Sequence, residues 1–111
     1  MSHAPLAFTD VGARSELEVV DQPWPVVYDA LVQTLPTVGF RIGEVDPQRG
    51  RIVAQTRNTR VTIAVGAIDA ITSEWIATAE QRIGIFPDRH ERQFATIRES
   101  LDRYLRTYYA V

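Results

Sequence analysis

The sequence predicts a two-layer α+β domain in the order β-α-β(4)-α, with an antiparallel sheet and both helices packed on one face. Five segments alternate apolar and polar residues, two repeat apolar residues at helical spacing, and short turns join the strands, which pairs them antiparallel. Each helix then buries its apolar stripe on the apolar face of the sheet. The 111 residues, 45% of them hydrophobic, suit one domain over 15–111 that follows a flexible N-terminal arm over 1–14.

The predicted strands are marked by residues that alternate between two faces. They are the segments 15–20, 40–45, 51–56, 60–68 and 73–85. Leu17 and Val19 share one face of the first strand, and Trp75 shares a face of the last with two alanines. Asp46–Gly50 predicts a hairpin, because its early proline sets a turn and its final glycine accepts positive φ. The sheet is expected to have one apolar and one polar face.

The first predicted helix follows the first strand. Asp21 is its predicted N-cap, and Pro23 and Pro25 are tolerated in its first turn. Its apolar positions are Val27, Ala30, Leu31, Thr34 and Leu35. Gly39 is a C-terminal signal, and Pro36 already weakens the last turn.

A second, longer helix of about five turns is predicted near the C-terminus. Asp88 and Glu91 form a capping-box-like pair at its start. Its apolar stripe consists of Phe94, Ile97, Leu101, Tyr104, Leu105 and Tyr108. Asp102 and Arg106 add an i,i+4 ion pair on its exposed side.

Composition excludes several kinds of chemistry. There is no cysteine, which excludes disulfides, thiolate metal sites and cysteine nucleophiles. All twelve cationic residues are arginine, so a lysine Schiff base and a P-loop lysine are excluded as well. The net charge of −2 argues against general nucleic-acid binding, and no apolar run approaches the roughly 20 residues of a transmembrane helix.

Five arginines fall within residues 32–60, against two acidic residues. Arg51, Arg57 and Arg60 are the candidates to contact a protein partner or an anion. Alternatively, these arginines keep the exposed face of a half-buried sheet soluble. Phosphate or nucleic-acid contact through them would be steeply salt-dependent.

The sequence contains no recognisable catalytic or metal-binding motif. His3 and His90 lack the spacing of metal ligands, and Ser15, Ser73 and Ser100 lie outside GxSxG and SxxK motifs. His90 with Asp88 and Glu91 suits an adventitious surface metal, but a solvated helix start explains the same residues. We therefore expect a protein that is not an enzyme and holds no cofactor.

Aromatic residues offer two further candidate sites. Trp24, Tyr28 and Tyr108 form an exposed patch for a partner if they cluster, or a hydrophobic staple around the first helix if they do not. A second set lies between the long helix and the sheet, as core or as contacts of an apolar ligand. It consists of Trp75, Phe94, Ile97 and Leu101. These large side chains are expected to fill that gap themselves.

Parts of the chain resemble known families. The stretch Val20–Leu31 resembles the strand-to-helix entry of START-like lipid-binding proteins, and the element order resembles the TATA-binding-protein-like, or helix-grip, architecture. Gly39–Ile42, Asp46–Gly50 and Arg51–Ala54 are similar to small bacterial envelope domains, among them the C-type accessory lipoprotein of the barrel-assembly machinery. The resemblance spans residues 15–108 as a pattern of elements. It implies the fold but not the function, because such folds host unrelated functions.

The sequence therefore predicts a non-catalytic binding or assembly module that acts through a sheet edge or the polar sheet face. Its expected partner is another protein or a second copy of itself, since the edge strands of a sheet present unpaired backbone groups. The alternative is a small carrier of an apolar ligand. The chain carries no targeting signal, which favours the cytoplasm, while the envelope resemblance leaves an excised periplasmic domain open.

Overall fold

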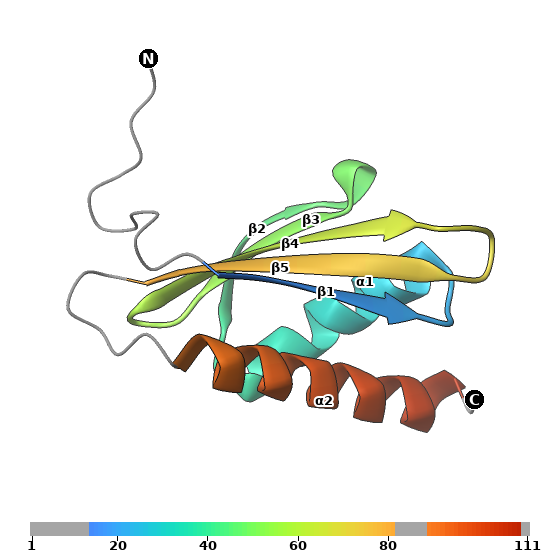
Figure 1. Ribbon diagram of the computed structural model, residues 1–111. Coiled ribbons are helices and arrows are strands. Elements are labelled where there is room, and N and C mark those ends of the chain that lie inside the picture. The colour runs from blue at the N-terminus through green and yellow to red at the C-terminus, as the bar shows by residue number, and fades with distance from the viewer. Residues whose placement is uncertain (1–13, 82–88, 110–111) are drawn as a thin grey trace, which may run out of the picture.

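The computed structural model describes residues 14–81 and 89–109 (Figure 1). Its elements are β1 (Arg14–Val20), α1 (Trp24–Thr34), β2 (Arg41–Asp46), β3 (Arg51–Gln55), β4 (Thr59–Ala67), β5 (Ser73–Gln81) and α2 (Arg89–Tyr109). This is the predicted β-α-β(4)-α order. The α+β class with an antiparallel sheet is confirmed.

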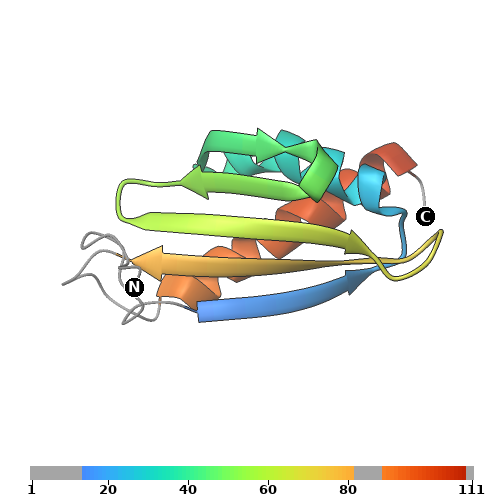
Figure 2. The same ribbon diagram turned by 90° about the horizontal axis from the view of Figure 1, so that it is seen from above.

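The sheet has the strand order β1-β5-β4-β3-β2, and every neighbouring pair is antiparallel. β1 pairs along its whole length with β5, from Arg14 opposite Ala79 to Val20 opposite Ser73. The first and last strands in the chain therefore lie side by side, and β1 and β2 form the two edges. Both helices lie on the same side of the sheet (Figure 1). The view from above looks onto the opposite side of the sheet and shows the strands in front of both helices (Figure 2).

The core lies between the sheet and the two helices. The strands contribute the buried residues Ile52, Ala54, Val61, Ile63, Val65, Trp75, Ala77 and Ala79. The helices and the segment after α1 contribute Val27, Tyr28, Ala30, Leu31, Leu35, Phe40, Phe94, Ile97, Leu101 and Leu105. The helical spacing and the strand alternation thus predicted the buried face of α1, α2, β4 and β5 correctly, except that Tyr108, at the end of the α2 stripe, is 67% exposed.

The start of α1 differs from the prediction. Asp21 is not the N-cap, because the helix begins after Pro23 and no side chain caps it. Instead, the Pro23 carbonyl accepts hydrogen bonds from the amides of Val26 and Val27, at 3.1 and 3.2 Å. Pro25 has no N–H, so the first turn has one donor fewer to satisfy and needs no side-chain cap.

The end of α1 follows the prediction. The α-helix tightens at Leu35 into a 3₁₀ turn that contains Pro36, and Gly39 stops it with φ of 95°. The predicted continuation of β5 beyond Gln81 and the Asp88 half of the capping box lie outside the described residues, as does the N-terminal arm up to residue 13. Neither described helix is long and apolar enough to cross a membrane.

Candidate functional site

One face of the sheet packs on the helices, and we call the opposite one the open face. No described segment crosses the open face in Figure 2, which looks onto it. Eight uncharged residues of β1, β5, β4 and β3 occupy its middle, and we call them the central patch. They are Ser15, Leu17, Val19, Ile76, Thr78, Thr62, Ala64 and Val53.

The central patch owes its apolar character mainly to β1. Leu17 lies opposite Ile76 and is 51% exposed, while Val19 lies opposite Glu74 and is 57% exposed. The prediction that Leu17 and Val19 share a face is confirmed. The expectation that the second sheet face is polar is wrong at β1, because these two apolar side chains lie on the open face.

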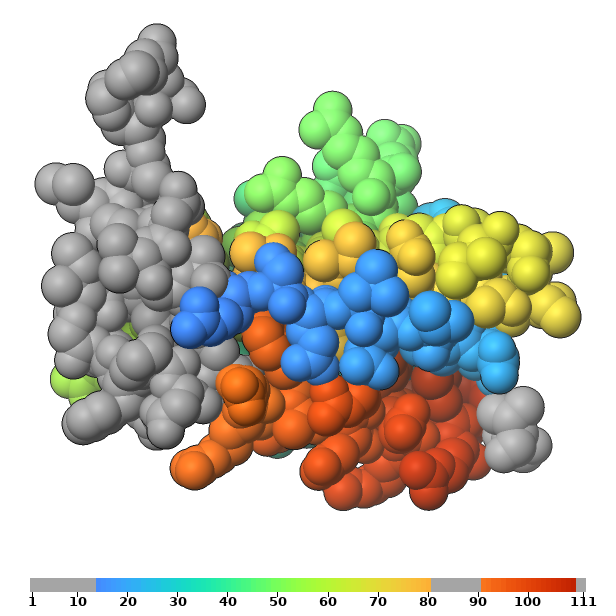
Figure 3. All heavy atoms as spheres, in the orientation of Figure 1, coloured from blue at the N-terminus to red at the C-terminus, as the bar shows by residue number. Residues whose placement is uncertain are grey.

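Arg98 of α2 binds the two carboxylates that β1 places on the helix side of the sheet. With Leu17 and Val19 on the open face, Glu16 and Glu18 turn toward α2. The Arg98 guanidinium contacts the Glu16 carboxylate, and its Nη1 lies 3.5 Å from Glu18 Oε2. Space-filling spheres show β1 lying along α2 (Figure 3). One arginine thus holds both carboxylates of the edge strand in place.

Small side chains give the central patch little relief. Ala64, Thr62, Thr78 and Ser15 carry little bulk, and the Ser15 and Thr78 hydroxyls lie 3.1 Å apart in a hydrogen bond across β1 and β5. Because this bond joins two patch residues, it leaves fewer polar groups that need water when the patch is covered. The patch is suited to close contact with a second surface.

The two ends of the open face carry opposite charge. The arginine-rich end, where β3 turns into β4, has Arg41, Arg57 and Arg60 against Glu80. The acidic end, where β4 turns into β5 and β2 into β3, has four carboxylates against two arginines. Its residues are Glu44, Asp46, Asp69, Glu74, Arg49 and Arg51. Two of them border the central patch, because Glu44 lies opposite Val53 and Arg51 opposite Ala64.

The structure does not bring Arg51, Arg57 and Arg60 together. Arg51 begins β3 at the acidic end, whereas Arg57 lies in the turn after β3 and Arg60 opposite Gln55 at the other end. Arg60 is held by Glu80, with Nη2 and Nε at 2.9 and 3.2 Å from the same oxygen. No single anion site therefore contains all three.

Arg41, which the sequence did not single out, is the arginine that joins Arg57. The two line a shallow hollow with Gly39, Gln55 and Thr56. The β2–β3 register provides the signal, because Arg41 lies opposite Gln55, two residues before Arg57.

The four interior candidates are core residues. Trp75, Phe94, Ile97 and Leu101 are 1–2% exposed. They lie in one cluster with the other buried residues, as expected if they fill the gap between helix and sheet. The Trp75 indole Nε1 is buried without a hydrogen-bond partner. That N–H suits a polar group of a ligand.

Tyr28 does not contribute to an exposed aromatic patch. It is buried, and its hydroxyl donates a 2.9 Å hydrogen bond to the Arg51 carbonyl, which ties α1 to the start of β3. Burial raises the pKa of this hydroxyl above its usual value. Trp24 meets Tyr28 edge-to-face at 6.3 Å, while the exposed Tyr108 packs on Tyr104 at 4.6 Å.

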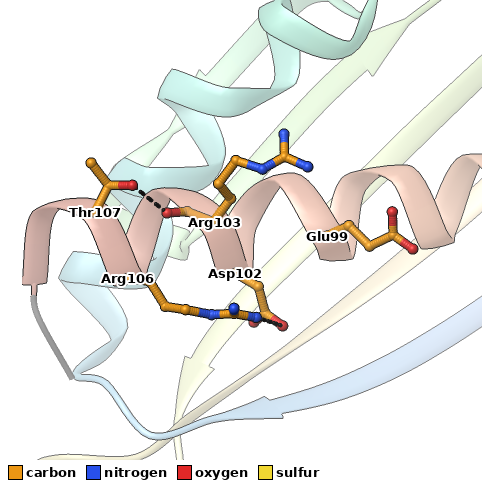
Figure 4. A pocket seen from close by; sticks show the side chains of 5 residues that line it. All are labelled: Glu99, Asp102, Arg103, Arg106 and Thr107. Atoms are coloured by element: carbon orange, nitrogen blue, oxygen red, sulfur yellow. Dashed lines mark hydrogen bonds and ion pairs between the residues drawn. The ribbon is translucent and has the colours of Figure 1, made fainter.

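A hollow on the outer side of α2 lies away from these candidates (Figure 4). Asp102 and Arg106 form the predicted ion pair at 3.8 Å, and Thr107 Oγ1 donates to the Arg103 carbonyl at 2.8 Å. The lining residues all belong to one helix. Their side chains do not converge on a common point, so the hollow carries no chemistry that we can assign.

Within residues 14–81 and 89–109, no three histidine or acidic side chains gather as metal ligands would. The combination of His90 with Asp88 is not tested, because Asp88 and the side chain of His90 lie outside what the structure describes.

The two sheet edges differ in regularity. β2 contains a register shift between Ile42 and Glu44, a bulge that interrupts its free side. β1 is unbroken over seven residues, but two of them are the glutamates held by Arg98. Inward charges and bulges are devices that protect sheet edges from pairing with another chain.

No family model matches the sequence, and a search of curated proteins finds no match. Among solved structures, the fold is similar to that of protein CV1439 from Chromobacterium violaceum, with a TM-score of 0.55. The similarity covers 82% of this chain and 94% of that one, at 13% sequence identity. At this identity the match shows the shared fold alone.

Proposed function

We propose that this protein is a non-catalytic binding or assembly module whose working surface is its sheet. The observation that carries the proposal is the central patch, in which Leu17 and Val19 are more than half exposed. A soluble domain gains stability by burying such side chains, so apolar residues gathered on an uncovered face favour an interaction surface. From the sequence we expect the interaction surface to be either a sheet edge or the face away from the helices. The exposed apolar side chains favour that face, the open face.

The candidate side chains support a role without catalysis. Arg60 pairs with Glu80, Arg98 with Glu16 and Glu18, and Arg106 with Asp102. Such pairs fix neighbouring elements to one another. A catalytic site needs a base placed against a nucleophile or substrate, and none of these pairs offers that arrangement.

At the level of family, we propose membership of the helix-grip, or TATA-binding-protein-like, group. The support is the β-α-β(4)-α order together with a sheet in which the first strand lies beside the last. The similarity of residues 39–54 to small bacterial envelope domains favours an assembly role of the same kind.

A carrier of an apolar ligand is the alternative, and the unpartnered Nε1 of Trp75 is the observation that favours it. The close packing of Phe94, Ile97 and Leu101 around the same core weighs against it, because a ligand needs volume that these side chains already fill.

Native mass spectrometry of gently purified protein separates the two functions. An assembly module gives multiples of the 12.5 kDa chain, or this chain with a second protein, and no small adduct. A reproducible extra mass of a few hundred daltons that is lost in Trp75→Phe would replace the module with the carrier. Turnover of any screened substrate would also overturn the proposal.

A further inference from the structure

We propose that the open face packs against the open face of a second copy of this chain, giving a two-fold dimer of stacked sheets. The inference rests on the proposed function and names the partner and the surface. It follows from the composition of the face, its size, the state of the two edges and the placement of charge.

The composition of the face suits another sheet. The central patch is uncharged. Its border carries the Arg60–Glu80 ion pair and three further charges, because Arg51 lies opposite Ala64, Glu44 opposite Val53 and Glu74 opposite Val19. Two sheets that stack face to face approach to about 10 Å, which requires small or interdigitating side chains. Thr62, Ala64 and Thr78 are small, while Leu17 and Val19 supply the apolar area to be buried.

The size of the face meets the lower limit for a stable dimer. Five strands about 4.8 Å apart, with a mean length of about 24 Å, give roughly 600 Å² per protomer. Two such faces bury about 1,200 Å², the lower end of specific protein interfaces. We therefore expect a reversible dimer whose population depends on concentration.

The edges are poor alternatives for self-association. In an antiparallel pair of two β1 strands, each central register places a glutamate opposite a glutamate: Glu16 opposite Glu18, or either opposite itself. Like charges directly opposite each other destabilise a strand pair. At the other edge, the bulge between Ile42 and Glu44 interrupts the ladder that a partner would extend.

Charge selects one of the two ways in which the faces can stack. A two-fold axis across the strands places the arginine-rich end of one copy over the acidic end of the other, and β1 over β1 of the second copy. An axis along the strands places ends of like charge together and β1 over β2. Only the first arrangement matches opposite charges and also brings Leu17 and Val19 against their own counterparts.

Sedimentation velocity over a concentration series tests the dimer. The wild type is expected to form dimers, Leu17→Arg to weaken association about tenfold or more, and Val45→Arg to behave as wild type. Val45 is the matched control, because it is 49% exposed, as Leu17 is at 51%, but lies opposite Ile52 on the helix side of the sheet. If circular dichroism shows that Leu17→Arg does not fold, Ala64→Arg is used in its place. Ala64 is exposed and lies at the middle of the face.

A single introduced cysteine tests the arrangement, since the natural chain has none. A short bismaleimide is expected to link Leu17→Cys dimers and to leave Val45→Cys unlinked. A wild type that stays monomeric, equal association of both arginine variants, or no linkage of Leu17→Cys would each overturn the proposal. A monomer that retains a different protein in native mass spectrometry would overturn the self-association and leave the assembly function standing.

Discussion

At the residue scale, Gly50 brings the β2–β3 hairpin into direct contact with β4. Its carbonyl accepts a 2.7 Å hydrogen bond from the Val65 amide, and its φ of 65° is in the left-handed region. A Cβ at this position would lie 2.2 Å from the Val65 carbonyl oxygen. Gly39 also has positive φ, at 95°, but a Cβ there would meet nothing within 4 Å.

The two glycines therefore predict different costs for the same substitution. Gly39→Ala is expected to lower the free energy of unfolding by about 1 kcal/mol, because alanine is strained at positive φ. Gly50→Ala adds a clash with the backbone of β4 and is expected to lower it by about 3 kcal/mol or more. Urea denaturation of both variants measures the difference. Equal costs would contradict the close approach of Gly50 to β4.

Asp69 ties the turn between β4 and β5. Its carboxylate accepts a 2.9 Å hydrogen bond from the Ile71 amide, and this bond lowers the pKa of Asp69 below its usual value of 3.8. Because the pKa is lower in the folded state, the stabilisation is present above pH 3.8 and is lost as the pH falls through the folded pKa.

We therefore expect the Asp69 carboxyl to titrate below pH 3.8 in an NMR experiment. Asp69→Asn retains a side-chain oxygen that accepts from Ile71 and is expected to preserve the turn without the pH dependence, while Asp69→Ala loses the bond. A titration midpoint at or above 3.8 would show that the turn does not hold the carboxylate.

At the element scale, β1 is fixed to α2 through Arg98. Arg98→Ala leaves Glu16 and Glu18 facing the helix without a counter-charge, and we expect a loss of about 1 kcal/mol that shrinks at high salt. Arg98→Lys retains the charge and is expected to recover part of it.

The control for Arg98 is Arg106→Ala on the same helix. Its pair with Asp102 is 3.8 Å long and mostly solvated, so its loss is expected to change stability by less than about 0.5 kcal/mol. Thermal unfolding of the three variants measures these effects. If Arg98→Ala and Arg106→Ala were equivalent, the contact of Arg98 with β1 would contribute no more to stability than an exposed pair does.

For β1, the sequence predicts which residues share a face but not which face of the strand is buried. Alternation establishes that Leu17 and Val19 share a face, but an edge strand has period two whichever face is buried. In the structure the two glutamates of β1 face α2 and contact Arg98, 81 residues after Leu17, and nothing local to β1 reveals that contact. The N-cap of α1 is a similar case, because Asp21 fits the usual preference but the prolines make a cap unnecessary.

At the scale of the whole molecule, periodicity and turn residues are enough to predict the order of elements, the single antiparallel sheet and most of the core. They are not enough to predict the candidate site, because the open face combines side chains from five strands whose registers are long-range. Arg51 and Arg60 are near in sequence but lie at opposite ends of the β3–β4 ladder. Leu17 and Ile76 are far apart in sequence and lie side by side.

The open face as the interaction surface is the claim on which the proposed function depends. An NMR concentration series on the isotope-labelled chain examines it residue by residue in solution. We expect concentration-dependent amide shifts at β1, β5 and β4, centred on Leu17, Ala64 and Ile76, with the buried helix residues unchanged. Shifts restricted to the β2 edge or to α2 would contradict the claim, as would a spectrum that does not change with concentration and does not respond to Leu17→Arg beyond the mutated site.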